Sequence, residues 1–578
     1  MRLFAFLWTA PLALAQISVS LTPSVASPAH VGTRVTWTAS VSTDSDAYVY
    51  RFRTGGFGQD LRVVKDYSPD NTLDWTQANQ EGIYQVDVTV RNVQTGQVAH
   101  ADNWYYVQSN VSGGQPVITP TTHPLVFLYS APPCPAGSKM NVTFTSADGW
   151  TQTTPTKNCT GTFSMNFYLA GLRAGTQYVA QHVITTGSKS TEGPQLTFTS
   201  GTDLPANLTF STAQIPAPGN EPSPVMLQAT ILTPSIATDL SGNIIWYYTG
   251  KISFITRPEP GGYFFGVLED PAADSSGQIV REFDLQGVPV LETNAARVSQ
   301  QLVAQGKKPI GSFHHEARLL SNGNVLVLAG EEQILTDVQG PGPVDVLGDA
   351  IVVLDRNLNV VWSWDAFDHL DPHRKATEND VCYPGDCPPT YLASAPNDWL
   401  HGNSVAETPD GNLLYSSRSQ DWVIKIDYER GKGDGSVIWK LGKDGDFAMN
   451  SSDPNAWFSH QHDPQYENGS SSVIDLFDNG NLRNAVDPAA HSRGQVLQLD
   501  ESSRTVTPLL NADLGYYSFA LGAAQKLANG NYHFDVGFLS DGSSLSMEVD
   551  GAGVPVFSLR TAAPAYRTFR LQDMYTDP

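Results

Sequence analysis

Apolar and polar residues alternate along the N-terminal third of the chain. The alternation is clear at residues 34–41 (RVTWTASV) and 84–90 (YQVDVTV), and Pro, Gly, Asn and Asp interrupt it at short intervals. Period-two alternation is typical of strands with one buried face, and frequent turn residues are typical of a β-sandwich. We therefore predict a first β-sandwich over residues 16–110.

A second module follows a break of Ser and Gly at residues 109–114. Its segment 172–178 (LRAGTQY) resembles the turn before a late strand of fibronectin type III domains, whereas the first module resembles immunoglobulin-like or PKD-like domains. The sequence thus predicts a fibronectin III-like β-sandwich over residues 111–205. Neither module concentrates reactive side chains, so we expect both to act as spacers or walls.

From residue 206 to residue 578 one pattern recurs. A turn with Asn-Gly or Asp-Gly, which tight hairpins prefer, precedes an apolar strand at residues 321–326, 409–414 and 528–532. A companion strand recurs at residues 242–246, 287–290, 358–362, 435–439 and 553–557. Repeated hairpins that cannot cover their own faces form the blades of a propeller. The prediction is all-β: a β-propeller of about six blades, preceded by two β-sandwich modules, with no sustained amphipathic helix.

The charge of the chain narrows the choice of partners. Lys and Arg number 34 against 58 Asp and Glu, a formal net charge of -24. This balance disfavours nucleic acid and anionic membrane surfaces, because both repel an acidic protein. An anionic small molecule must then be attracted by a local cluster of His and Arg.

The first residues predict export. Met1-Arg2 precedes an apolar run that ends in Ala13-Leu14-Ala15, the pattern of a signal peptide over residues 1–15. The run is shorter than the span of about 20 residues that crosses a bilayer. A buried N-terminal strand or helix is the alternative. We expect a periplasmic or secreted protein without a membrane span.

Four cysteines form two local pairs, and an even number fits an exported chain. We predict disulfides between Cys134 and Cys159 and between Cys382 and Cys387. A zinc site is the rival interpretation, but neither pair has the CxxC spacing of such sites. No metal is expected.

Histidine and arginine gather in four short motifs within the predicted propeller. They are HHE at residues 314–316, DWLHGNSV at 398–405, SSRSQ at 416–420 and QHD at 461–463. Each lies at or beside the beginning of a repeat, where an innermost strand meets the channel. This shared position predicts one site built from several blades.

Together with IWKLG at residues 438–442, the ordered motifs resemble the arylsulfotransferase family of bacterial aryl-sulfate sulfotransferases, from near residue 208 to the end. The resemblance implies a six-bladed propeller with an N-terminal β domain, and sulfuryl transfer without the nucleotide donor PAPS. It matches His462 to the nucleophile and His315, His401 and Arg418 to the sulfate-binding residues. Asn403 is a candidate helper in substrate binding.

Two features depart from that family pattern. Two sandwich modules stand where the family has one, which leaves a homodimer open. The first motif also holds two histidines, and we assign the catalytic role to His315 because it directly precedes the acidic residue. His314 is kept as a substrate-binding candidate that points to the other side of a strand.

The chemistry of these residues suits sulfuryl transfer. By analogy with phosphoryl transfer, in-line attack needs fixed donors for negative charge spread over three oxygens, and Arg and His supply them. A neutral His462 imidazole can attack sulfur and form a sulfohistidine, which makes the reaction ping-pong. Either His315 or His401 is then the general acid and base. The expected partners are an aryl sulfate donor and a phenolic acceptor, with no cofactor.

Other interpretations remain open at this stage. A hydrolytic aryl-sulfate esterase would transfer to water, but the formylglycine motif Cys/Ser-x-Pro-x-Arg of known sulfatases is not evident. A quinone-bearing propeller and a non-catalytic secreted adhesin or binding scaffold are further alternatives. Aromatic residues near the channel form either an aromatic wall or ordinary core: Trp399, Trp457, Tyr516 and Tyr517.

Overall fold

A computed structural model describes residues 17–42, 47–219, 221–383, 387, 389–393 and 395–578. The predicted signal peptide therefore lies outside the described residues. Strands make up 49% and helices 4% of the structure, so the predicted all-β class is confirmed. Of the helices that the described part of the chain contains, none has the length and apolar character needed to cross a bilayer.

Region I, residues 17–108, consists of two sheets around one apolar core. One sheet has the order β1 (Val19–Pro23), β3 (Val35–Val41) and β6 (Thr72–Trp75). The other has β2 (Ala29–His30), β8 (Val98–Gln108), β7 (Gly82–Asn92), β4 (Tyr48–Gly56) and β5 (Arg62–Ser68). Trp37 and Trp75 from the first sheet pack with Phe52 and Val88 from the second. The alternation read from residues 34–41 and 84–90 thus places apolar side chains between two sheets.

Region II, residues 117–199, again has two sheets. They are β14 (Met165–Leu169), β10 (Phe127–Ala131) and β9 (Val117–Pro120), and β12 (Thr151–Thr153), β11 (Lys139–Ser146), β15 (Gln177–Thr186) and β16 (Lys189–Glu192), with β13 (Lys157–Asn158) on β11 and β17 (Leu196–Thr199) on β15. The predicted disulfide between Cys134 and Cys159 is present, with both residues in the core. Regions I and II correspond to the two predicted modules, whose assignment as separate domains stays a prediction.

Six antiparallel sheets follow, here numbered 1 to 6 with the innermost strand first. Sheet 1 is β44 (Ala565–Leu571), β19 (Val225–Thr230), β20 (Ser235–Asp239) and β21 (Ile244–Tyr248). Sheet 2 is β22 (Phe254–Glu259), β23 (Tyr263–Leu268), β24 (Ile279–Asp284) and β25 (Pro289–Asn294). Sheet 3 is β26 (Ser312–Leu319), β27 (Val325–Thr336), β28 (Pro343–Leu354) and β29 (Val360–Asp365), with β30 (Asn397–Asp398) parallel to β28.

Sheet 4 is β31 (Gly402–Glu407), β32 (Leu413–Ser417), β33 (Trp422–Ile426) and β34 (Val437–Leu441). Sheet 5 is β36 (His462–Tyr466), β37 (Val473–Asp478), β38 (Arg493–Asp500) and β39 (Thr505–Asp513), with β35 (Ala448–Met449) at its edge. Sheet 6 is β40 (Ala523–Lys526), β41 (Tyr532–Val536), β42 (Ser544–Val549), β43 (Pro555–Thr561) and β18 (Ser211–Ile215).

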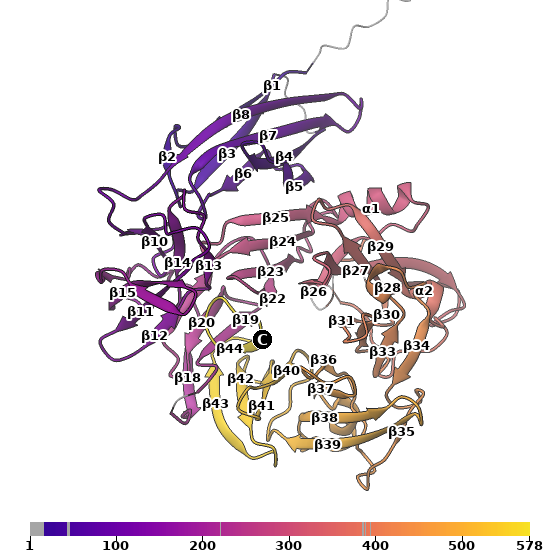
Figure 1. The fold of residues 1–578 in the computed structure, drawn as a ribbon. Helices are drawn as coiled ribbons and strands as arrows, with labels where there is room; N and C mark the ends of the chain where they lie inside the picture. Colours follow the sequence, from indigo (N-terminus) through magenta and orange to yellow (C-terminus); the bar gives the residue numbers. More distant parts are fainter. Residues whose placement is uncertain (1–16, 43–46, 220, 384–386, 388, 394) are drawn as a thin grey trace, which may run out of the picture.

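The six sheets surround a common centre, and we call this arrangement the six-sheet ring (Figure 1). The innermost strands contact one another in order, from β22 through β26, β31, β36 and β40 to β44. The last strand, β44, pairs with β19 near the beginning of the ring, while β18 pairs with β43. Both ends of this part of the chain therefore close the circle by backbone hydrogen bonds.

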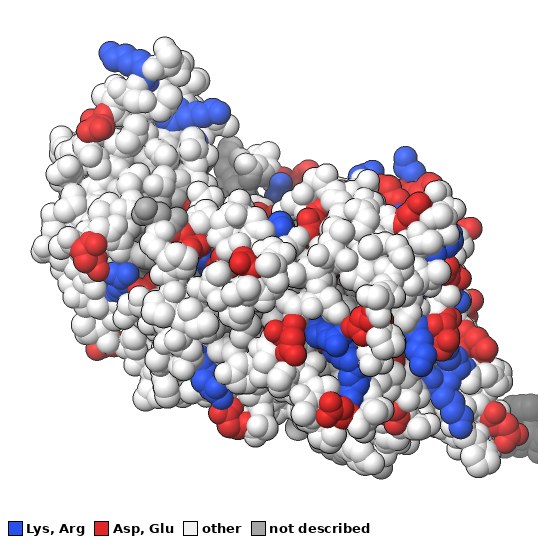
Figure 2. All heavy atoms as spheres, turned by 90° about the horizontal axis from the view of Figure 1, so that it is seen from below, with Lys and Arg blue, Asp and Glu red and all other residues white. Residues whose placement is uncertain are grey.

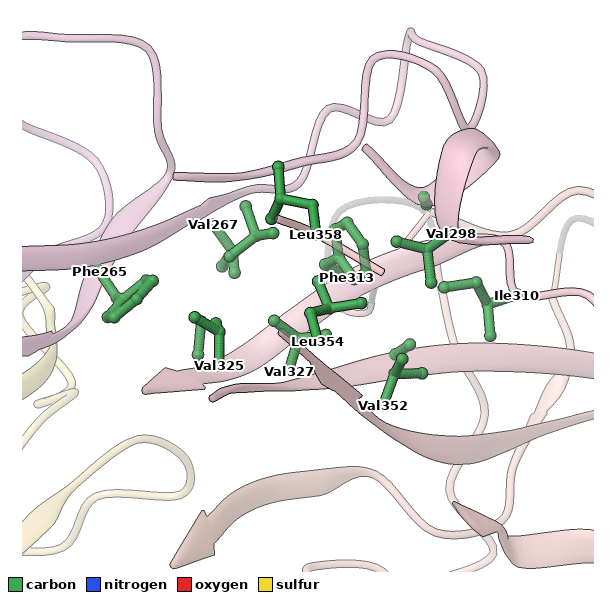
Figure 3. Close-up of a cluster of buried hydrophobic side chains, with 14 of the residues drawn as sticks. Phe265, Val267, Val298, Ile310, Phe313, Val325, Val327, Val352, Leu354 and Leu358 are labelled. Carbon is green, nitrogen blue, oxygen red and sulfur yellow. The ribbon is translucent and has the colours of Figure 1, made fainter. Parts of the chain in front are cut away.

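Apolar side chains fill the space between neighbouring sheets. Figure 3 shows Phe265 and Val267 of β23 facing Val325 and Val327 of β27. Helix α1 (Ala295–Ala304) covers this layer with Val298, and Asn294 caps the helix by accepting a hydrogen bond from the Arg297 N–H at 2.9 Å. This ten-residue helix is the one element type that the sequence pattern did not predict; α2 (Ala366–His369), the 3-10 helix η1 (Glu429–Gly431) and α3 (Asn481–Val486) are short.

Region I is joined to sheet 2 of the six-sheet ring. Strand β5 lies parallel to β25, with Lys65 opposite Glu292, so that one sheet of nine strands spans both parts. On the face shown in Figure 2, acidic and basic side chains are interspersed among many uncharged ones. The described residues on that face form no extended basic surface.

Candidate active site

The predicted site residues lie where the innermost strands lose their regular pairing. His315 lies in β26, His401 directly precedes β31 and His462 begins β36. The register of each strand shifts at this point, between Phe313 and Ala317, between Gly402 and Ser404, and between His462 and Gln465. Such bulges redirect side chains away from the regular alternation.

The same places carry an unusual backbone. The φ angles of His315, His401 and Asp463 are 56°, 48° and 52°. Positive φ is uncommon for residues other than glycine and concentrates at functional sites, because the surrounding structure has to hold it. The strain points to the same short segments as the motifs do.

Four predicted residues meet in one place. The rings of His315 and His401 lie 5.0 Å apart between their centroids, and the backbone N–H of Arg418 donates to the backbone carbonyl of His401 at 3.3 Å. The positive charge of Arg418 acts directly on the pKa of His462. Three sheets thus bring three imidazoles and one guanidinium together.

His462 is buried and has a defined tautomer. Its Nδ1 lies 2.7 Å from Oδ1 of Asn479, and its Nε2 accepts the N–H of Leu521 at 3.2 Å. The Asn479 amide is oriented because its nitrogen donates to the carbonyls of Ser518 and Leu521. The proton of His462 is therefore on Nδ1, and the lone pair is on Nε2.

Electrostatics keep His462 neutral. Burial lowers its pKa well below the usual range, and the charges of Arg418, His401 and Arg567 lower it further, although Asn479 opposes them. A neutral imidazole with one unprotonated ring nitrogen is the nucleophilic form. Neither Asn479 nor Leu521 was predicted, because FDNGN at residues 477–481 has the appearance of an ordinary turn.

His401 has a different partner. Its Nδ1 lies 2.5 Å from Oδ2 of Asp398, three residues earlier in the same motif. A carboxylate on one ring nitrogen holds the imidazole in orientation and stabilises the imidazolium that forms when the other nitrogen takes a proton. Sγ of Cys387 lies 3.7 Å from the same Asp398 oxygen, so the predicted disulfide with Cys382, which is present, packs against this pair.

The expectation that His314 points away from His315 is wrong. Nδ1 of His314 lies 2.9 Å from Nδ1 of His315, because the bulge and the positive φ of His315 break the alternation of β26. Nε2 of His314 lies 3.2 Å from Oδ1 of Asp349. His314 therefore stands behind His315 and orients it.

The two neighbouring imidazoles have opposite pKa shifts. Burial lowers the pKa of His315 well below its usual range, and the charges of His401 and His314 add to this effect. Burial also opposes protonation of His314, but Asp349 outweighs it and raises the pKa. His315 is thus the neutral imidazole of the pair, and His314 is the protonated one.

Arg418 is held at the border of the site. It is 8% exposed, its Nη2 donates to the carbonyl of Phe519 at 3.4 Å, and its Nη1 lies 3.9 Å from Asp380. Asp380 also lies 3.3 Å from His460, and these cations bring its pKa to about 2 although burial opposes the shift. His460 is fully buried between Asp380, Glu378 and Asp421.

Asn403 makes hydrogen bonds that connect neighbouring strands. Its Nδ2 donates to the carbonyl of Gln461 at 2.7 Å, and its own carbonyl accepts from Oη of Tyr566 and Nη2 of Arg567. The ring of Tyr566 lies 5.5 Å from that of His315. Asn403 thus fixes the residue before His462, whereas a contact with substrate stays a prediction.

A buried charge cluster below the site was missed from the sequence. The acids that follow the two motif histidines, Glu316 and Asp463, are clamped by Arg257 and Arg567. Nη1 of Arg567 lies 3.0 Å from Glu316, and Arg257 pairs with both acids. Arg567 of β44 was not predicted, because its partners come from other sheets.

Two groups of described residues have ligand types that metals use. One is Cys382, Cys387 and Asp398, whose cysteines are bonded to each other; the other is Glu378, Asp380 and His460. In the second group the imidazole already lies 3.3 Å from both carboxylates. The disulfide uses the cysteines of the first group, and ion pairing accounts for the second.

A sequence model of the family described as Arylsulfotransferase (ASST) matches residues 186–555. The chain belongs to the arylsulfotransferase family. The match begins within β15, earlier than the motifs indicated, and it includes all four. At the family level this arylsulfotransferase is a sulfotransferase that acts on small molecules.

Other comparisons add little. No curated protein matches the chain. Among solved structures, it is similar to purple acid phosphatase PPD1 from yellow lupin, at 12% identity over 34% of this chain and 43% of that chain, with a TM-score of 0.16. The FN1–FN3 domains of chicken CNTN1 match at 11% identity over 30% of this chain and 64% of theirs, with a TM-score of 0.13. Scores this low carry no argument.

Proposed function

We propose that this arylsulfotransferase is a PAPS-independent aryl-sulfate sulfotransferase. It moves a sulfuryl group from a phenolic sulfate ester to a phenol in a ping-pong reaction through a sulfohistidine. The observation that carries the proposal is the neutral His462, with its lone pair on Nε2, beside Arg418, His315 and His401. The six-sheet ring is accordingly a six-bladed β-propeller, and regions I and II are sandwich modules of immunoglobulin-like and fibronectin III-like type.

In the first half-reaction, Nε2 of His462 attacks sulfur. A nitrogen–sulfur bond forms and the bond from sulfur to the aryl oxygen breaks, so that a phenol leaves. Arg418 and neutral His315 donate hydrogen bonds to the sulfuryl oxygens, where negative charge is concentrated. The N–H of Leu521, which donates to Nε2 at 3.2 Å in the resting site, is released by the attack and becomes a further donor.

The surroundings separate the roles of His401 and His315. Asp398 lies 2.5 Å from His401, and a carboxylate in this position supports an imidazole that takes and gives a proton. Burial and neighbouring positive charge disfavour the cationic form of His315, in which both ring nitrogens carry a proton. We therefore assign proton transfer to His401: it protonates the leaving phenolate and later accepts the proton of the acceptor phenol.

In the second half-reaction, the acceptor oxygen attacks sulfur and the nitrogen–sulfur bond breaks. His462 returns to its neutral tautomer. His401 accepts the proton of the acceptor phenol, which replaces the proton that it gave to the leaving phenolate. Asn479 holds Nδ1–H throughout, so the same nitrogen is the leaving group. No cofactor is needed for these steps.

The direct test is a covalent intermediate. Brief exposure to an aryl sulfate, followed by mass spectrometry, is expected to give a sulfuryl adduct on the peptide that contains His462. His462→Ala should lose the adduct and lower transfer about a thousandfold or more, since a nucleophile is removed. His100→Gln, an exposed histidine of β8, is the control. Normal turnover in His462→Ala contradicts the proposal.

The role of Asp398 has its own test. Asp398→Asn should lower transfer about a hundredfold, in the range that general acid–base catalysis contributes, and change the pH–rate profile. The adduct should still form with a donor whose phenol is a good leaving group, because that phenolate needs no proton. An equal loss for good and poor leaving groups would mean that Asp398 has only a structural role.

Acceptor dependence separates the alternatives. Release of p-nitrophenol that rises with added phenol supports transfer, whereas release that ignores phenol identifies a hydrolytic esterase. Binding without turnover would identify an adhesin or scaffold. Two disulfides suit an oxidising compartment, and we place the protein in the periplasm or outside the cell.

A further inference from the structure

A cavity of about 350 Å³ lies beside the segments that carry His401 and Arg418. It is lined by residues between α2 and β34, including Leu400 and Gln420, and none of the proposed catalytic side chains lines it. Its size is that of a pocket for a small organic molecule. The proposed sulfuryl transfer leaves this cavity without a role.

Two cations share one aromatic ring in its wall. Cζ of Arg374 lies 3.9 Å from the ring centroid of Trp422, and Nζ of Lys440 lies 5.0 Å from it. In the part of the chain that the structure describes, neither cation lies within 4.0 Å of a carboxylate. Nη2 of Arg374 donates to the backbone carbonyl of Gln420 at 3.4 Å, and stacking leaves the rest of the N–H edge of the guanidinium for a further partner. In a chain of net charge -24, two such cations in one cavity call for an anion.

Buried polar atoms of the wall also lack partners. Trp399 and Gln420 are each 1% exposed, and Nε1 of Trp399, Oε1 of Gln420 and Nε of Arg374 have no hydrogen-bond partner among the described residues. Buried polar groups are nearly always paired, and these three unpaired atoms belong to residues that line the cavity. The indole N–H of Trp399 and the Nε–H of Arg374 are donors and suit an anion, whereas Oε1 of Gln420 is an acceptor and suits the polar edge of a ligand.

The nearby carboxylates do not neutralise these cations. Asp371 lines the cavity, but it is exposed and accepts the backbone N–H of His373 at 3.0 Å. Burial lowers the pKa of Arg374, and the charges of Asp444 and Asp421 only partly oppose this shift. The positive charge is therefore available to a ligand.

We propose that this cavity is a second binding site, which takes an aromatic monoanion such as a sulfonate, carboxylate or sulfate ester. The anionic group lies against Arg374 and Lys440. The aromatic part lies against the apolar lining of Leu370, Trp399 and Leu400. The site is independent of the proposed transfer reaction, since it needs no nucleophile.

The probe is 2-naphthalenesulfonate, in which a carbon–sulfur bond replaces the transferable ester. Binding is measured by calorimetry and tryptophan fluorescence in Arg418→Gln, so that the candidate active site does not contribute. One equivalent should bind and change the fluorescence. Adding Arg374→Gln and Lys440→Gln should weaken binding at least tenfold, whereas the charge-matched pair Arg62→Gln and Lys432→Gln, both exposed, should leave it unchanged.

Three results would overturn the proposal. They are equal binding in the Arg374/Lys440 variant and its control, equal affinity for inorganic sulfate, and equal affinity for the neutral 2-naphthalenemethanol. Lys440→Gln alone, with at least a threefold loss expected, covers the case in which the double variant does not fold. Failure of sulfuryl transfer is recognised separately, by the absence of the His462 adduct.

Discussion

Region I and the innermost strands of the six-sheet ring are both β structure, yet they use polar residues in opposite ways. In region I, β3 alternates regularly, with Trp37 buried and the polar Thr36 partly exposed. In β26 of the six-sheet ring, His314, His315 and Glu316 are consecutive and all buried. A regular strand makes a wall with one wet face, whereas a bulged strand can bury several polar groups in a row.

The two parts therefore differ in how much buried charge they must stabilise. Burying a charge is unfavourable unless it is paired, so the six-sheet ring needs Arg257 and Arg567 to hold Glu316 and Asp463. Ion pairs of region I, such as Arg34 with Asp74, stay partly exposed to water. We expect charge substitutions to be severe in the first place and mild in the second.

The largest loss of stability is expected when a substitution breaks the buried charge cluster. Glu316→Gln should lower the free energy of unfolding by about 4 kcal/mol, because it leaves buried guanidinium charge without its partner. Asp74→Asn in region I should cost about 1 kcal/mol, since that pair is near water. Both are measured by urea denaturation. Equal losses in the two variants would contradict the comparison.

The two disulfides allow a second comparison, between a bond in region II and a bond beside the candidate active site. Cys134 and Cys159 are 25 residues apart, and their removal by Ser should cost about 3 kcal/mol through the entropy of the unfolded chain. Cys382 and Cys387 are 5 residues apart, which predicts about 2 kcal/mol. Unfolding is measured by thermal denaturation of each double variant.

Activity should rank these variants the other way. Loss of the short disulfide should lower transfer at least tenfold, because Cys387 packs against Asp398 and so supports His401. Loss of the long one, within region II, should leave transfer within about twofold of the original rate at a temperature where the protein is folded. An unchanged rate without the Cys382–Cys387 bond would remove that support from the site.

The last predicted effect is a pH dependence of the stability. His533 in β41 is fully buried, and burial lowers its pKa to about 3 from 6.5. Below pH 6.5 the unfolded chain takes up a proton that the folded protein refuses, so stability is present above pH 6.5 and is lost as the pH falls. By pH 5 the loss is about 2 kcal/mol. His533→Asn should remove this contribution of about 2 kcal/mol between pH 7 and pH 5 and leave that of the other buried histidines, and exposed His100→Gln should retain the whole slope.

Local sequence determined much of this protein. Period-two alternation and Asn-Gly turns gave the strands, because both act within a few residues. The spacing of the cysteines gave both disulfides, and the motifs gave the residues of the candidate site and the family. These features need no knowledge of which strands lie beside which.

Tertiary structure decided how those residues are oriented and protonated. Asn479 and Leu521 set the tautomer of His462, and Asn403 fixes the residue before it; these neighbours come from other strands and loops. His314 turns toward His315 because a bulge overrides the alternation of β26. Protonation depends on burial and on charges that lie close in space, so only the closed ring of sheets keeps His462, the proposed nucleophile, neutral.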